Sequence, residues 1–260
     1  MTSIDFESIS NVRDLGGIAS GDDRTIRHGL FYRGGALNKA TQTDAEKLLS
    51  LGITCAIDLR TGWEHREKPS IEIPGIEYIH IPFFDQDMVG IEYIKPLANT
   101  RMIGHDFACD PNDFYRAMIN PLTVGQMKKA LHVVFDRAQA GLSTYVHCSG
   151  GKDRAGVLSM LILAILGANR ADILEDYLLT NIARDKNFDS IYARFLRLCE
   201  DPDRALEITN AHRALPENLD HVYDEIEIQY GSVDAFIHDA LGFNDEDISQ
   251  IRMTCTEKGA

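Results

Sequence analysis

Apolar and polar positions alternate along the first two thirds of the chain in a pattern that predicts strands and helices in turn. Short apolar runs at residues 30–33, 53–57, 76–81 and 143–147 predict buried strands. Helical periodicity spans residues 43–51 and 123–140, and Gly52 and Gly141 end these two segments. We expect capping boxes from Thr43 with Glu46 and at residues 123–126. Helices followed by strands predict an α/β fold with a mostly parallel central sheet flanked by helices.

A very apolar helix is predicted at residues 155–166, and after Gly167 the chain is predicted to be wholly helical. Helical periodicity appears at residues 171–180, 189–199, 217–230, 233–241 and 246–253. We expect a single domain over residues 1–260, in which residues 182–260 form a helical extension. Residues 85–121 lack a regular pattern and are interpreted as a lid or insertion, with an ordinary surface excursion as the alternative.

Composition and charge narrow the class of function. The chain has 260 residues, 44% hydrophobic and 25% charged, which is typical of a globular protein, and its formal net charge is −14. An acidic protein of this kind does not hold nucleic acid by bulk attraction, so we expect no nucleic-acid partner. An anionic substrate would need a local basic pocket. The longest apolar run, residues 157–166, is too short to span a bilayer, and we expect no membrane span.

The cysteines and histidines show no metal or disulfide pattern. Five cysteines occur at positions 55, 109, 148, 199 and 255, with no CxxC pair, which favours reduced thiols. The histidines lack the spacing of metal ligands, and we expect no metal or cofactor. The first residues show no secretory signal, so a cytoplasmic location is the expectation, with unconventional secretion as the alternative.

The chemistry is concentrated in one loop between the predicted strand 143–147 and the predicted helix 155–166. The loop reads Cys148-Ser149-Gly150-Gly151-Lys152-Asp153-Arg154. A thiol at a helix N-terminus is favoured as thiolate, which is the nucleophilic form. The backbone N–H groups of residues 149–154 can surround an anion, and the two glycines allow the curvature that this requires. The planar fork of Arg154 matches two phosphate oxygens. The loop therefore predicts covalent cleavage of a phosphate ester at Cys148.

The loop HCSGGKDRAG resembles the signature loop of the protein-tyrosine phosphatase superfamily, and in particular its bacterial branch with the HCxxGKDR pattern. That branch includes secreted mycobacterial and listerial phosphatases of broad specificity, which act on phosphotyrosine and phosphoinositides. Four other segments resemble motifs of the branch: NVRDLGG at 11–17, YRGGAL at 32–37, DLRT with Glu64 at 58–64, and EDYLL at 175–179. The resemblance covers most of the chain up to about residue 181.

The resemblance also implies roles for individual residues. Cys148 would be the nucleophile and Arg154 the phosphate binder, with Lys152 adding a positive charge at the pocket mouth. Asp153 and Asp58 would lie at the active site. Many relatives have Thr or Ser directly after the arginine, where this chain has Ala155, so we expect slow hydrolysis of the phosphoenzyme.

Three carboxylates compete for the role of proton donor. Asp153 either donates the proton or contacts substrate, or it is a carboxylate favoured in the first turn of a helix. Asp58 is either catalytic or pairs with Arg60 or Arg13. Asp85 follows a predicted strand and could act as the general acid from a mobile loop.

Supporting roles are expected for three further residues. We expect Arg13 and Asp14 to form an ion pair that braces the loop. His147 is expected to support the loop by donating to backbone near the thiolate, without carrying protons.

Together these features predict a cysteine-dependent tyrosine phosphatase that releases phosphate from phosphorylated proteins. The main alternative is a phosphoinositide phosphatase. Two further alternatives are a non-catalytic phosphate-binding module and a sulfur-transfer enzyme. An inactive relative would normally lose Cys148 or Arg154, and both are present.

Overall fold

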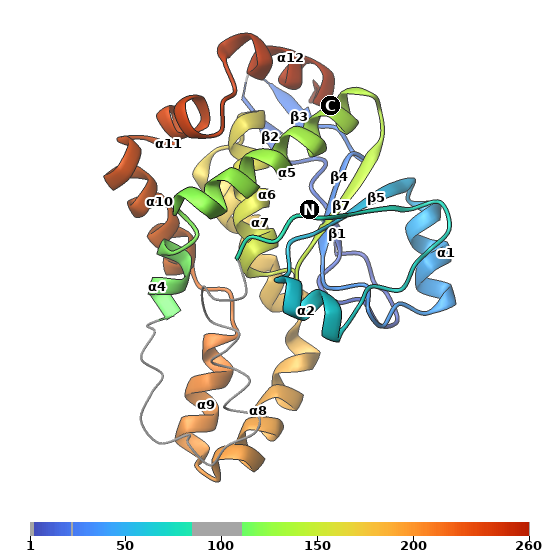
Figure 1. Ribbon diagram of the computed structural model, residues 1–260, viewed down its shortest axis with the longest axis vertical. Coiled ribbons are helices and arrows are strands. Elements are labelled where there is room, and N and C mark those ends of the chain that lie inside the picture. Colours follow the sequence, from blue (N-terminus) through green and yellow to red (C-terminus); the bar gives the residue numbers. More distant parts are fainter. Residues whose placement is uncertain (1–2, 22, 85–110, 260) are drawn as a thin grey trace.

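The computed structural model describes residues 3–21, 23–84 and 111–259. It has a central five-stranded sheet, most of whose strands are labelled in Figure 1. The strand order is β1-β4-β7-β5-β6, in which β1 is antiparallel to β4 and the other pairs are parallel. The strands are β1 (Arg13–Asp14), β4 (Phe31–Gly34), β5 (Ile53–Asp58), β6 (Glu77–His80) and β7 (Ser143–His147). The predicted α/β class with a mostly parallel sheet is therefore confirmed.

The parallel strands end together at one edge of the sheet. In the strand register His147 lies opposite both Gly34 and Asp58, and Asp58 lies opposite His80. Loops that follow these strands therefore converge at this edge, where α/β folds place their ligands.

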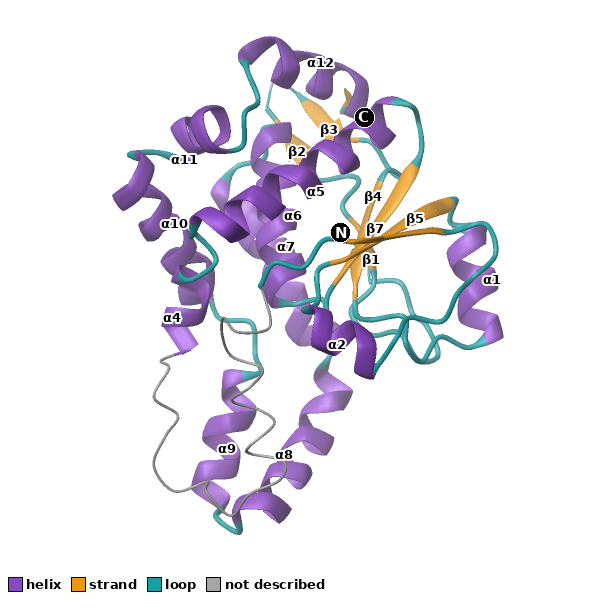
Figure 2. Ribbon diagram, in the orientation of Figure 1, coloured by secondary structure: helices purple, strands orange, loops and turns teal. Residues whose placement is uncertain are grey.

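Helices cover both faces of the sheet (Figure 2). Alternate residues of β5 point to opposite cores: Ile57 packs in the larger core with α5 and α6, and Ala56 packs in the smaller core beside α1. The helices of the first part of the chain are α1 (Gln42–Ser50), α2 (Gly62–Glu67), α4 (Pro111–Arg116), α5 (Pro121–Gln139) and α6 (Asp153–Leu166). Nearly every side chain of α6 is buried, which explains its apolar sequence.

Two helix starts differ from the prediction. The capping box of α1 is formed by Thr41 and Asp44, two residues before the predicted pair. The Asp44 carboxylate also accepts the backbone N–H groups of Glu7 and Ser8, and this tertiary contact fixes the start of the helix. Helix α5 begins earlier than predicted because Asn120 caps it.

The C-terminal part is not wholly helical, which corrects the prediction. Strand β8 (Thr256–Lys258) pairs with β3 (Arg24–Ile26), which also pairs with β2 (Ala19–Ser20), to form a second sheet. The helices here are α7 (Arg170–Ala183), α8 (Asp185–Cys199), α9 (Pro202–Ala211), α10 (Pro216–Tyr230), α11 (Val233–Ala235), the π-helix η1 (Phe236–Ala240) and α12 (Asp245–Cys255). Helix α9 lies in the part predicted to be helical, but none of the individual periodic segments named from the sequence covers it. It packs against α8, and this pair projects from the body of the protein (Figure 1).

Within the described ranges, no helix has both the length and the apolar character needed to cross a membrane.

Candidate active site

The cysteine loop joins the end of β7 to the start of α6, at the edge where the parallel strands end. Cys148 follows β7 directly and is only 2% exposed. Gly151 has a φ of +66°, and a Cβ there would lie 2.4 Å from the backbone carbon of Gly34. Only glycine fits this close approach. No side chain caps the N-terminus of α6, which leaves its first N–H groups facing the loop.

Donors from outside the loop hold its carbonyl groups. Asn11 Nδ2 donates to the carbonyl of Gly150 (3.1 Å), and Arg33 Nη2 donates to the carbonyl of Gly151 (2.9 Å). The N–H of Ala36 donates to the carbonyl of Ser149 (3.3 Å). The N–H groups of residues 149–152 have no acceptor among the described residues. With its carbonyls turned outward, the loop can direct these N–H groups at an anion.

A buried ionic cluster braces the loop from behind. Arg13 and Arg33 both pair with Asp176 of α7, each at 2.7 Å, and all three side chains are 1% exposed. The predicted pair of Arg13 with Asp14 is wrong. Asp14 instead accepts the N–H groups of Gly16 and Gly29 and so closes a turn. Arg13 still supports the loop, because it holds the Oδ1 of Asn11 at 2.6 Å.

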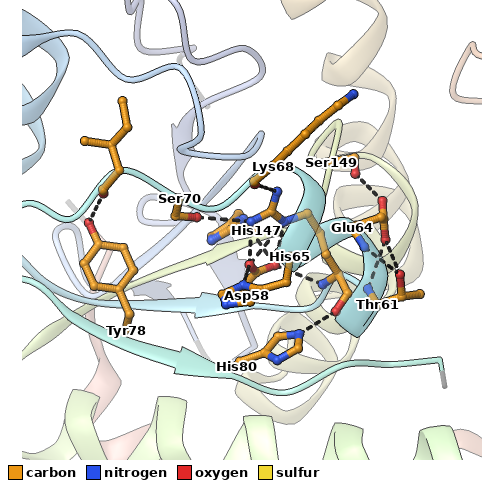
Figure 3. Close-up of polar contacts among 12 residues, drawn as sticks. Asp58, Thr61, Glu64, His65, Lys68, Ser70, Tyr78, His80, His147 and Ser149 are labelled. Carbon is orange, nitrogen blue, oxygen red and sulfur yellow. Dashed lines mark hydrogen bonds and ion pairs between the residues drawn. The ribbon is translucent and has the colours of Figure 1, made fainter. Parts of the chain in front are cut away.

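Glu64 of α2 orients the guanidinium of Arg154. Its carboxylate accepts from Arg154 Nη1 (2.5 Å) and Nη2 (3.1 Å), from the Ser149 hydroxyl, and from the N–H of Thr61 (3.0 Å), as Figure 3 shows in part. Burial alone would raise the pKa of Glu64, but Arg154 outweighs it and holds the pKa below its usual value. The Nε of Arg154 is buried without a partner among the described residues, so its N–H is available to a ligand.

Asp153 begins α6 and stands beside the loop with 32% of its side chain exposed. Its Oδ1 lies 3.1 Å from the Lys152 ammonium and accepts from the Tyr115 hydroxyl of α4. Burial alone would raise the pKa of Asp153, but Lys152 and the Tyr115 hydrogen bond lower it below its usual value. Both of these contacts fall on Oδ1, so Oδ2 is the oxygen left to face a substrate.

Lys152 does not project at the pocket mouth as predicted. Its residue is 4% exposed, and its ammonium donates to the carbonyls of Ala211 and Arg213, each at 3.2 Å. The Lys152 ammonium therefore contacts both Asp153 and the backbone at the C-terminal end of α9.

Asp58 is held in an ion pair at the end of β5. Arg60 Nη2 lies 2.7 Å from its Oδ2, and His65 Nδ1 lies 3.0 Å from the same oxygen (Figure 3). Burial would raise the pKa of Asp58, but hydrogen bonds from Arg60 hold it well below its usual range. Of the two alternatives predicted for Asp58, the structure therefore shows the ion pair with Arg60. This pair keeps the carboxylate ionised, so it is not ready to donate a proton.

His147 is fully buried between the sheet and the loop. Neither ring nitrogen has a hydrogen-bond partner among the described residues, and Nδ1 lies 3.8 Å from Asp58. The backbone of Cys148 nevertheless lies close enough to favour the protonated ring, so the expected support of backbone near the thiolate stays a prediction. Burial lowers the pKa of His147 to about 4, so the ring is neutral near pH 7. The ring stacks on that of Tyr145.

Other predicted features fall outside the site or outside the described ranges. Asp85 lies outside the described residues. No cluster of metal-ligating side chains occurs in the part of the chain that the structure describes. Sequence reasoning gave no role to Asn11, Arg33, Glu64 or Asp176. All four lie within the segments at 11–17, 32–37, 58–64 and 175–179 that resemble motifs of the phosphatase branch. Membership of these motifs was the signal that could have identified them.

Sequence comparisons identify a family and several relatives that this chain resembles. The sequence model of the tyrosine phosphatase family matches residues 4–257. A protein assigned as a tyrosine-protein phosphatase in Cupriavidus necator is 28% identical over 95% of this chain and 86% of its own length. The triple specificity protein phosphatase PtpB of Mycobacterium tuberculosis is 26% identical over 93% of this chain and 95% of its own length. A tyrosine-protein phosphatase of Nostoc commune is 23% identical over 88% of this chain and 75% of its own length.

Proposed function

The chain belongs to the tyrosine phosphatase family, and from this premise we propose that it hydrolyses phosphate monoesters through a phosphocysteine at Cys148. Family membership confirms the resemblance and the enzyme class predicted from the sequence. The observation that supports these residue roles is the anchored loop. Its carbonyls are held from outside, Cys148 lies at its base, and Arg154 is fixed by Glu64 with Nε left over.

The reaction proceeds in two displacements. The Cys148 sulfur forms a bond to phosphorus while the ester P–O bond breaks, and the leaving oxygen takes a proton. Water then attacks phosphorus, the S–P bond breaks, and inorganic phosphate and the thiolate are released. Loop N–H groups and the Arg154 guanidinium stabilise the charge on the transferring phosphoryl oxygens in both steps.

Asp153 is the proton donor in this proposal. It stands at the loop with part of its side chain exposed, whereas Asp58 is committed to Arg60. The lowered pKa of Asp153 opposes this role in the free enzyme. A bound phosphate dianion raises the pKa of a neighbouring carboxyl by charge repulsion, and so favours the protonated form when substrate is present.

The substrates that we propose are phosphorylated tyrosines of proteins. The names of the relatives support this class, and the name of the mycobacterial relative indicates more than one substrate class for that protein. Lys152 is buried and its ammonium binds backbone carbonyls, so we assign it no contact with a second phosphate of the substrate.

Hydrolysis of p-nitrophenyl phosphate in the presence of a chelator tests the proposal. We expect activity without added metal in the unchanged chain, and none in Cys148→Ser. Arg154→Ala should also abolish turnover. Activity that survives in Cys148→Ser, or that needs a metal ion, would contradict the proposal.

A further inference from the structure

Arg184 stands apart from the other basic side chains around the loop. Lys152 is paired with Asp153, Arg154 with Glu64, and Arg13 and Arg33 with Asp176. Arg184 has no ion pair or side-chain hydrogen bond with any described residue, and its Nε is buried without a partner. The chain has 40 acidic and 26 basic residues, so acidic partners are not scarce. A buried polar group of this kind calls for an explanation.

The guanidinium of Arg184 lies directly against the catalytic loop. A Cβ built on Gly150 would be 3.1 Å from Arg184 Nη1 and 3.4 Å from its Cζ. Gly150 is two residues from Cys148, so this contact places a cation within the loop's immediate surroundings. A side chain at position 150 would displace the guanidinium, and glycine leaves it room.

The backbone holds Arg184 at this place. The residue is the joint between α7 and α8, where its N–H donates to the carbonyl of Thr180 (3.0 Å). The Thr180 hydroxyl accepts from Asn11 Nδ2 (3.4 Å), and the same Nδ2 donates to the carbonyl of Gly150 (3.1 Å). One chain of contacts therefore fixes both the loop and the end of α7, and Arg184 is positioned by rigid elements.

A second cation, Lys152, lies in the same region as Arg184. His212, in the segment after α9, is half-buried, and its pKa is lowered first by burial and also by Lys152 and Arg184, while Asp153 acts in the opposite direction. Arg184 is half-buried, and among the described residues its Nε has no hydrogen-bond partner and its guanidinium forms no ion pair with a carboxylate. Such a group favours an anion brought by a ligand.

We propose that Arg184 binds a second phosphate of the substrate, next to the phosphate that Cys148 attacks, and so favours compact substrates with two neighbouring phosphates. The inference rests on the proposed function of the loop. Two phosphates on adjacent ring carbons are separated by only a few bonds. This short separation suits two cations, Arg154 and Arg184, that lie at the same short loop. An acidic side chain that flanks a phosphotyrosine is separated from the scissile phosphate by the whole tyrosine ring, which is a poorer fit to an arginine against Gly150.

Competitive inhibition of p-nitrophenyl phosphate hydrolysis measures this directly. The probes are myo-inositol bisphosphate with phosphates on adjacent carbons and the corresponding myo-inositol monophosphate. We expect the bisphosphate to bind the unchanged enzyme more tightly. In Arg184→Ala the ratio of the two inhibition constants should fall about tenfold or more, the size of a lost charge-assisted hydrogen bond. Arg184→Lys should retain part of the preference, because it keeps the charge and loses the fork.

The matched control is Arg197→Ala, which removes the same charge from an exposed position in α8, roughly 20 Å further along the helix axis. It should leave the ratio unchanged. A dioctanoyl lipid with the same bisphosphate headgroup separates the two sources of the ligand. If the ratio of inhibition constants in Arg184→Ala falls for both the free headgroup and the lipid, the enzyme recognises the headgroup itself. If the ratio falls for the lipid alone, the ligand comes from a membrane.

Three results would overturn the inference. The first is a ratio that is unchanged for both the free headgroups and the lipids in a folded, active Arg184→Ala protein. The second is an equal fall in Arg197→Ala, which would indicate net charge alone. The third is a larger loss for a phosphotyrosine peptide with acidic neighbours than for the bisphosphate, which would make the partner a protein carboxylate. An unchanged enzyme without p-nitrophenyl phosphatase activity would instead contradict the proposed function.

Discussion

Removing the Glu64 carboxylate should strongly destabilise the protein, because it leaves the Arg154 charge buried and unpaired. The two side chains are 10% and 6% exposed, and they share two hydrogen bonds of 2.5 and 3.1 Å. Breaking a buried pair by removing one partner costs about 3–5 kcal/mol. Glu64 also caps α2 with Thr61, which adds about 1 kcal/mol. We therefore expect Glu64→Ala to lower the free energy of unfolding by roughly 4–6 kcal/mol, the sum of these two costs.

Urea denaturation near pH 7 provides the measurement, with the midpoint falling and the slope unchanged. Glu67→Gln is the control, because Glu67 lies exposed at the end of the same helix. The double variant Glu64→Ala/Arg154→Ala should be less destabilised than the two single effects added together, since it no longer buries an unpaired charge. A loss below about 1 kcal/mol in Glu64→Ala, the range of an exposed pair, would refute the reasoning, as would additive effects in the double variant.

The pH dependence gives a second check on Glu64. The pKa of its carboxyl is lowered in the folded protein, so the free energy that it contributes is present above the usual glutamate pKa of about 4.3. This contribution is lost as the pH falls from there through the lowered pKa. The difference in stability between the unchanged protein and Glu64→Gln should therefore shrink in acid. A constant difference down to the acid transition would contradict the assignment.

Three further predictions concern the reaction and the buried carboxylates. Asp153→Asn should lose most activity on esters with poor leaving groups and least on p-nitrophenyl phosphate, measured as kcat over a leaving-group series; an equal loss on every ester would show that Asp153 only positions the loop. Ala155→Ser should speed phosphoenzyme hydrolysis and reduce any burst in rapid-mixing kinetics. Serine is preferred to threonine because Ala155 is fully buried, and an unchanged second step would count against this role. Asp58→Asn should cost about 3–5 kcal/mol at neutral pH in urea denaturation and little in acid, because the pKa of Asp58 is lowered in the fold; equal losses at both pH values would rule out the ion pair with Arg60 as the cause.

The cysteine loop could be predicted from the sequence because its geometry is local. Strand β7 occupies residues 143–147, the same residues that the apolar run predicts, and the loop and helix follow without interruption. Here neighbouring residues determine the conformation. The glycines indicate a sharply curved loop, and the cysteine indicates a nucleophile.

The supports of the loop could not be predicted because they are long-range contacts. Arg13 has an acidic neighbour at position 14, yet it pairs with Asp176, which is 163 residues away in the sequence. The start of α1 shows the same limit. Thr41 with Asp44 and Thr43 with Glu46 are equally spaced, and only the contact of Asp44 with residues 7–8 selects the first pair. The sequence predicts that Lys152 is an exposed charge. In the structure its ammonium instead donates to backbone carbonyls at the C-terminal end of α9.

Trapping the covalent intermediate tests the central claim most directly. The protein is mixed with p-nitrophenyl phosphate and denatured rapidly in acid, and the peptide that contains Cys148 is examined by mass spectrometry. We predict that this peptide gains one phosphoryl group at sulfur, and that the modification is absent in Cys148→Ser and grows weaker in Ala155→Ser. Continued hydrolysis of substrate by a protein whose Cys148 never carries phosphate would contradict the account.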